Sequence, residues 1–117
     1  MNIEEYREYC ISKKGVTEAF PFDKNTLVFK VFGKMFCLAD VNLFESINVK
    51  CEPGKAIELR EKHPAVIPGY HMSKKHWNTL ILDSSISDKL LFQWIDDSYN
   101  LVVSGLTKTQ KEQLGNL

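Results

Sequence analysis

The side chains that could carry chemistry gather in one short segment, residues 63–79. This segment contains all three histidines of the chain, together with a lysine pair and two large aromatic residues. Lysines on a loop can neutralise phosphates, histidines can donate hydrogen bonds to them, and an exposed aromatic ring can stack on a base. The segment is therefore a candidate nucleic-acid surface. Its candidate ligand-facing residues are Tyr70, His71, Lys74, Lys75, His76, Trp77 and Asn78.

Each of these residues also has a purely structural interpretation. Trp77 opens an apolar stretch and could belong to the core, while Asn78 could hold a turn. Lys74 and Lys75 could be ordinary solvated charges at a loop tip. Residues 50–76 carry six basic and three acidic side chains, but the whole chain has a formal charge of zero. Any affinity for nucleic acid should therefore be modest and steeply dependent on salt.

The histidines also raise the question of a metal site. Three imidazoles, on His63, His71 and His76, would suffice for zinc if they converged. Their spacing is not a recognised ligand pattern. His63 follows an expected helix, where the helix dipole stabilises an imidazolium without any metal. We therefore expect no metal and no other cofactor.

Catalysis would need a nucleophile and a base. Cys37 or Cys51 could pair with a histidine, and Ser98 lies beside Tyr99. The sequence around them suggests neither an oxyanion hole nor a strained nucleophile turn. Tyr99 has the spacing of a core residue in an expected helix, where Ser98 would bond to backbone. We therefore expect a protein that is not an enzyme.

Length and composition predict one globular domain spanning residues 1–117, since 44% of the residues are hydrophobic and domains typically have about 100–150 residues. No uncharged run is long enough to span a bilayer, and the amino terminus lacks the features of a secretory signal. The three cysteines have no Cys-x-x-Cys spacing, so we interpret them as reduced and mostly buried. We expect a cytoplasmic location.

The apolar pattern predicts an α+β fold. Spacings of three and four residues predict helices, and β-branched or alternating runs predict strands. The expected helices are 2–14, ended by Gly15, then 53–62, 88–104 after an N-cap at Ser87, and a last helix opened by a capping box of Thr107 and Gln110. The expected strands are 27–32 and 35–40, joined as a hairpin at Gly33-Lys34, then 46–51, 70–72 and 77–82. Residues 19–23 are an expected loop, Pro68-Gly69 an expected type II turn, and residues 73–76 a wing-like loop. The predicted order is α-β-β-β-α-β-β-α-α, an antiparallel sheet with helices mainly on one face.

The run from Pro68 to Thr79, continued by Leu82-Asp83 and residues 98–102, resembles the signature of the MmcQ/YjbR family of small bacterial proteins. The Phe20-Pro21-Phe22 loop and the β-meander also stand where that family has them. This resemblance implies a compact fold similar to the frataxin-like (CyaY-like) arrangement and a DNA-binding role described as a double-wing motif. The family often has Asn or another polar residue where Ser73 stands, a departure that concerns only how the loop is capped.

Two function classes follow. The leading hypothesis is a non-enzymatic DNA-binding protein that uses the loop and strands between Tyr70 and Asn78. The alternative is a protein-protein interaction adaptor that uses the same surface without binding nucleic acid, which the zero net charge suits better. Salt distinguishes the two, because phosphate-driven binding weakens steeply as salt rises and an aromatic protein interface barely responds. A monomer is expected.

Overall fold

The computed structural model describes residues 1–70 and 72–117, so the candidate residue His71 lies outside the described residues. The helices are α1 (Ile3–Ile11), α2 (Pro53–Lys62), α3 (Asp88–Ser104) and α4 (Lys108–Gly115). The strands are β1 (Val16–Ala19), β2 (Thr26–Val31), β3 (Lys34–Asp40), β4 (Ser46–Lys50), β5 (Val66–Pro68) and β6 (Trp77–Ile81). They form one six-stranded sheet in the order β1-β2-β3-β4-β6-β5, and every neighbouring pair is antiparallel.

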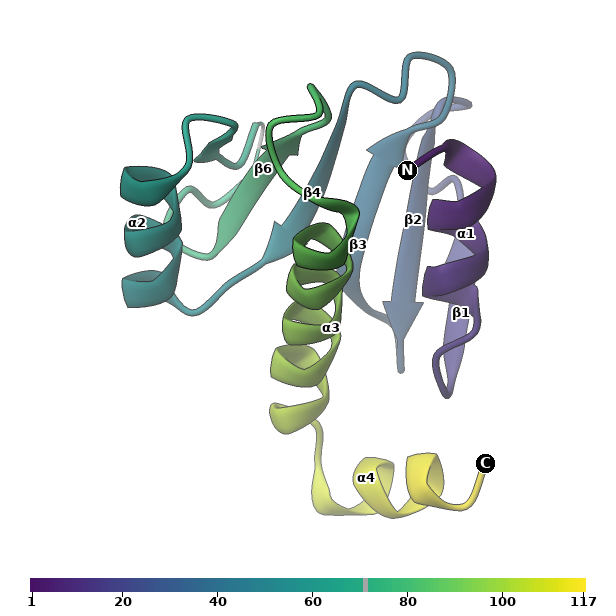
Figure 1. Cartoon of the computed structure of the whole chain (residues 1–117). Helices are drawn as coiled ribbons and strands as arrows, with labels where there is room; N and C mark the ends of the chain where they lie inside the picture. The colour runs from purple at the N-terminus through teal and green to yellow at the C-terminus, as the bar shows by residue number, and fades with distance from the viewer. Residues whose placement is uncertain (71) are drawn as a thin grey trace.

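Three of the helices, α1, α2 and α3, lie side by side on one face of this sheet (Figure 1). The main core fills the space between them and the strands. Its largest members have no exposed surface and include Tyr6, Phe29, Phe36, Leu80 and Ile95. The predicted α+β class, with an antiparallel sheet and helices mainly on one face, is confirmed. Within the described part of the chain, no helix has the length and apolarity that a membrane span requires.

The helix ends follow the local sequence signals at most positions. Ser87 caps α3 by accepting the Leu90 N–H, and the predicted capping box of Thr107 and Gln110 opens α4. The first helix is shorter than expected and ends at Ile11 rather than at residue 14. Gly15 does adopt a left-handed φ of 72°, but it turns the chain into β1 instead of ending the helix.

The expected order lacked one strand, β1. This strand has only four residues, of which Val16 and Thr17 favour strands while Glu18 and Ala19 do not, so its local signal is short. Hydrogen bonding to β2 stabilises this strand, in a register that runs from Val16 opposite Val31 to Ala19 opposite Val28. The hairpin of β2 and β3 is confirmed. Phe32 and Gly33 both have positive φ at its turn, 49° and 75°, as a two-residue type I′ turn requires.

The strand expected at residues 70–72 was wrong, and so was the type II turn. The strand that pairs with β6 is β5, which lies before the turn, and Tyr70 and Met72 lie outside the strands. Only Gly15 and Gly33 have positive φ among the glycines of the described chain, whereas a type II turn would need it at Gly69. Glycine is required there for another reason, since a Cβ on Gly69 would lie 2.7 Å from the Cβ of Trp77.

Candidate functional site

The helix-free face of the sheet carries a groove of about 740 Å³. Cross-strand partners point to the same face of a sheet, and Leu38, Asn48 and Thr79 are opposite one another on β3, β4 and β6. All three line the groove, so its floor is formed by these central strands. Two loops add to the lining, one with Phe22 and Asp23 and the other with Tyr70, Met72 and Ser73. The groove thus lies where Tyr70, Met72 and Ser73 of the candidate segment adjoin the central strands.

The floor of the groove has an apolar part beside the polar side chains of Asn48 and Thr79. Val28, Leu38 and Trp77 form a small cluster of their own, and Met35 and Met72 pack against it. Trp77 is only 8% exposed, because the chain at Gly69 lies directly on it. Trp77 therefore forms part of the floor, which agrees with its structural interpretation and leaves its ring little surface for stacking on a base.

The rim of the groove holds two exposed aromatic rings. Tyr70 is 70% exposed and Phe22 is 64% exposed, although the two come from loops far apart in the sequence. Hydrogen bonds fix the Tyr70 end: its N–H donates to the Oγ1 of Thr79 at 3.1 Å, and that hydroxyl donates to Asn48 at 2.6 Å. Sequence reasoning missed Phe22 as a site residue. The signal was the aromatic Phe20-Pro21-Phe22 loop itself.

The charged residues that line the groove are acidic. Asp23 accepts the N–H groups of Asn25 and Thr26 at 2.8 and 2.7 Å, and these bonds, that of Asn25 first, hold the pKa of its carboxyl below the usual range. Asp40 similarly accepts two backbone N–H groups, from Asn42 and Leu43. Within the described residues, no Lys or Arg lines the groove. The groove therefore presents negative charge beside an apolar floor.

The basic part of the candidate segment forms a turn at one end of β6. Lys74, Lys75 and His76 are all exposed there. Two hydrogen bonds hold the backbone of this turn: the Nη2 of Arg60 on α2 donates to the Lys74 carbonyl, and the Cys51 N–H, just after β4, donates to the His76 carbonyl at 2.7 Å. Sequence reasoning did not single out Arg60 as a site residue.

Asn78 needs a correction, because it does not face the groove. Its side chain is fully buried on the helix side, where it accepts from the Nε of Arg60 at 2.7 Å and donates to the Ala56 carbonyl at 3.3 Å. It thereby ties α2 to β6. Neighbouring residues of a strand point to opposite faces, so Trp77 and Asn78 cannot share one ligand surface. That alternation was visible in the sequence.

The described histidines do not form a metal site. The His63 ring lies on the helix side, 5.1 Å from the ring of Trp94, while His76 is exposed on the turn. Across residues 1–70 and 72–117, no three side chains of His, Cys, Asp or Glu are grouped so as to hold a metal ion.

The sequence itself matches a known family. A family model described as YjbR matches residues 11–101. The chain belongs to the YjbR family. The Escherichia coli O157:H7 protein YbdF is 40% identical over 96 residues, which are 81% of this chain and 79% of that protein. YjbR of Escherichia coli strain K12 is 30% identical over 118 residues, covering all of both chains. The predicted MmcQ/YjbR resemblance is confirmed.

Solved structures of related proteins share the fold. The crystal structure of the Deinococcus radiodurans protein DR2400, with a domain of the DUF419 family, aligns with a TM-score of 0.90 at 38% identity. The alignment covers 97% of this YjbR-family chain and 88% of that one. A crystal structure of a Pseudomonas syringae protein aligns with a TM-score of 0.73 at 28% identity, covering 86% of this chain and 98% of its own. The frataxin-like (CyaY-like) relation stays a prediction.

Proposed function

We propose that this YjbR-family domain is a non-enzymatic binding module whose groove on the helix-free sheet face takes an apolar segment of a partner protein that also carries basic residues. The observation that supports this most is the combination of an apolar floor, two exposed aromatic rings and acidic lining residues in a single groove. A monomer in the cytoplasm is part of the same proposal.

The floor and rim fit an apolar partner segment. Met35 and Met72 pack against the floor, and methionine side chains adapt their shape to varied partners. Tyr70 and Phe22 leave large apolar surface in water, which is unfavourable unless a partner covers it. Aromatic residues and methionine are also the types enriched at protein interfaces. The volume of about 740 Å³ is enough for a few side chains of a bound segment.

The charge of the groove favours a basic partner segment over a phosphate backbone. Asp23 and Asp40 both line the groove, and the backbone N–H groups that they accept keep each carboxylate in place. A cationic side chain beside the apolar segment would be attracted to them, and a phosphate would be repelled. Charge at this position sets specificity and association rate more than total affinity.

DNA binding is the second candidate, and one observation favours it. Lys74 and Lys75 are both exposed on the turn, next to exposed His76 and near the Tyr70 rim. Such a turn could contact phosphates while the groove stays empty. This mode would follow the double-wing role that the family resemblance implies, and each lysine would add a salt-dependent contact.

Fluorescence anisotropy on the whole chain tests both candidates. The protein probes are two short labelled peptides with the same aromatic and aliphatic centre, one flanked by lysines and the other by glutamates. We expect the lysine-flanked peptide to bind more tightly, and binding to weaken in Phe22→Ala and Tyr70→Ala. Leu43→Ala is the matched control, since Leu43 is 68% exposed and lies outside the groove lining. Equal binding by both peptides, or equal loss in the control, would contradict the proposal.

The nucleic-acid arm uses a mixed-sequence duplex and a single strand at low and moderate salt. If DNA binding is correct, Lys74→Ala/Lys75→Ala should weaken binding and make the slope of log K against log salt shallower by about 2, since each phosphate contact contributes roughly 0.9. The double substitution Lys108→Ala/Lys111→Ala on α4 is the control, because both lysines are exposed there. Equal loss in the two double variants would mean that only non-specific charge matters.

A further inference from the structure

A second cavity, of about 170 Å³, lies on the opposite side of the sheet from the groove, between α2 and α3. It forms because the two helices pack on different strands: α3 lies on β3 and β4, while α2 contacts β5. Between the two helices a small space remains above the buried residues Val49 of β4 and Asn78 and Leu80 of β6. The cavity walls are mostly apolar and include Val49, Leu59, Leu80, Trp94 and Leu101.

The size and walls of this cavity suit one small ring. An engineered apolar cavity of about 150 Å³ in another protein binds benzene, so about 170 Å³ holds a single six-membered ring. Trp94 provides an aromatic wall, and aromatic pairs gain from edge-to-face or offset packing beyond the area that they bury. Leu59 and Leu80 provide aliphatic contact from two other elements.

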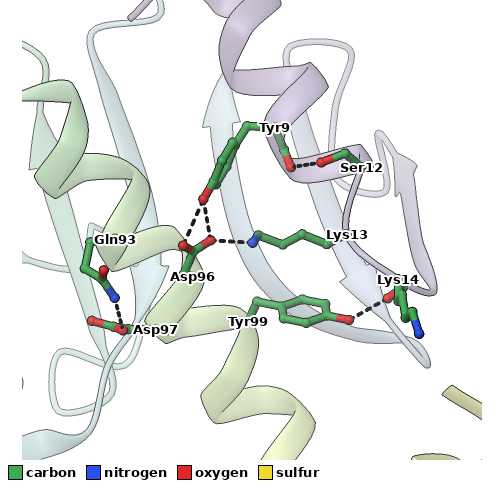
Figure 2. Close-up of polar contacts among 8 residues, drawn as sticks. All are labelled: Tyr9, Ser12, Lys13, Lys14, Gln93, Asp96, Asp97 and Tyr99. Carbon is green, nitrogen blue, oxygen red and sulfur yellow. Dashed lines mark hydrogen bonds and ion pairs between the residues drawn. The ribbon is translucent and has the colours of Figure 1, made fainter. Parts of the chain in front are cut away.

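The opening of the cavity carries negative charge. Asp97 lines it and accepts a hydrogen bond from the Nε2 of Gln93 at 2.9 Å, and within the described residues it makes no ion pair. Figure 2 shows that Asp97 points away from its neighbour Asp96, which is engaged with Tyr9 and Lys13. The Asp96 carboxylate is therefore occupied by contacts within the fold, whereas the Asp97 carboxylate lies at the cavity.

A second carboxylate, that of Glu52, also lines the cavity. It accepts the N–H groups of Gly54 and Lys55 at 3.0 and 2.9 Å, and these bonds hold its pKa below the usual range, so it stays charged. Two lysines line the cavity as well. The ammonium of Lys55 is 3.8 Å from Glu58 on its own helix, and Lys50 is paired with Trp77 across the strands, which directs its side chain to the groove face.

The half-buried thiol of Cys51 also lines the cavity, and its pKa responds to the charges around it. Burial raises its pKa, and the nearby charges of Glu52 and Asp97 raise it further, while Lys55 and Arg60 act in the opposite direction. Glu52 and Asp97 therefore lie close enough to act on this thiol, as do Lys55 and Arg60. A thiol that stays protonated is a poor nucleophile, so this position is suited to binding rather than to covalent chemistry.

We propose that the cavity between α2 and α3 binds a small primary amine carrying one aromatic ring, with the ring against Trp94 and the ammonium beside Asp97 and Glu52. The apolar walls select the ring and the two carboxylates select the positive charge. This site is independent of the groove, since it lies on the other face of the sheet and uses none of the exposed aromatic residues of the rim.

Heteronuclear NMR titration of the whole chain with benzylamine tests the proposal. The indole N–H of Trp94 should shift as benzylamine binds, while the indole of Trp77, in the groove floor, should stay unchanged. Benzyl alcohol, a neutral molecule of the same shape, should bind about five-fold more weakly, which is the size of an exposed ion pair. Shifts at Trp77 alone, or no shift at either indole, would overturn the proposal.

Two matched variants separate the contribution of the ammonium charge to binding from that of the aromatic ring. Asp97→Asn should weaken benzylamine about two-fold, because Glu52 still attracts the ammonium, and should leave benzyl alcohol unchanged. Glu112→Gln, an exposed acidic position on α4, should change neither. If Asp97→Asn and Glu112→Gln have the same effect on benzylamine, or if the amine and the alcohol bind equally, the charge selection proposed here is wrong.

Discussion

The two faces of the sheet are built from the same strands but differ in what covers them. On the helix side, three helices cover a core whose largest residues, such as Phe29 and Ile95, have no exposed surface. On the other face, a cluster of Val28, Leu38 and Trp77 stands alone under an open groove. Alternation along each strand therefore supplies one face that is packed under helices and one that carries the open groove.

Polar groups show the same difference. On the helix side, Ser98 of α3 accepts the Lys50 N–H at 2.8 Å and donates to the Phe36 carbonyl, so one buried hydroxyl joins α3 to β3 and β4. Within the described residues, no buried side-chain N or O atom lacks a partner. On the groove face, Asn48 and Thr79 bond mainly to each other beside the groove, where water can replace a lost partner.

The largest expected effect comes from the same truncation made on each face. Ile47→Ala, on the helix side with no exposed surface, should lower the free energy of unfolding by about 4 kcal/mol, because the surrounding core cannot collapse into the space. Leu38→Ala, 8% exposed on the groove face, should cost about 2 kcal/mol, since the opening there reaches solvent. Urea unfolding of both variants measures the difference. Equal losses would mean that the groove face is as tightly packed as the core.

A smaller effect is expected from two Asn→Ala substitutions on opposite faces. Asn78→Ala removes the acceptor of the Arg60 Nε and the donor to the Ala56 carbonyl, so it should cost about 2–3 kcal/mol. Asn48→Ala removes a single partner beside the groove and should cost about 1 kcal/mol or less. Urea unfolding again provides the measurement, and a larger loss in Asn48→Ala would reverse the comparison.

The smallest effect concerns the ionisation of Tyr9 on the helix side. Burial, and then the hydrogen bond to Asp96, raise the pKa of Tyr9 to about 12. Asp96→Asn should bring this pKa down toward the ordinary value of about 10, because the phenolate would no longer be repelled by a carboxylate. Alkaline titration followed by ultraviolet absorbance measures the change, with Tyr9→Phe assigning the transition.

The matched control for Tyr9 is Asp97→Asn. Asp97 is the next residue of α3 but points away from Tyr9 (Figure 2). Its substitution should leave the Tyr9 transition in place. A similar shift in both variants would show that the overall charge of α3, and not the contact between Asp96 and Tyr9, sets the pKa.

The sequence by itself determined the elements whose signals are local. The capping box of Thr107 and Gln110, the N-cap at Ser87 and the turn at Gly33 all act within a few residues of the chain, and all are present in the structure. Local hydrogen bonds and positive φ depend on near neighbours, which the sequence states directly. The apolar pattern also predicted the α+β class with helices mainly on one face, which the structure confirms.

Only the tertiary structure decided which strands the candidate segment pairs with and which side chains it contacts. β1 and β5 have only four and three residues and are held by pairing with β2 and β6, so their local signals were too short to place them. Arg60 reaches the turn at Lys74 because α2 packs beside β6. The groove unites Phe22 with Tyr70 from distant loops. Such contacts depend on register and on which face each helix covers, and these are properties of the assembled sheet rather than of any short stretch of sequence.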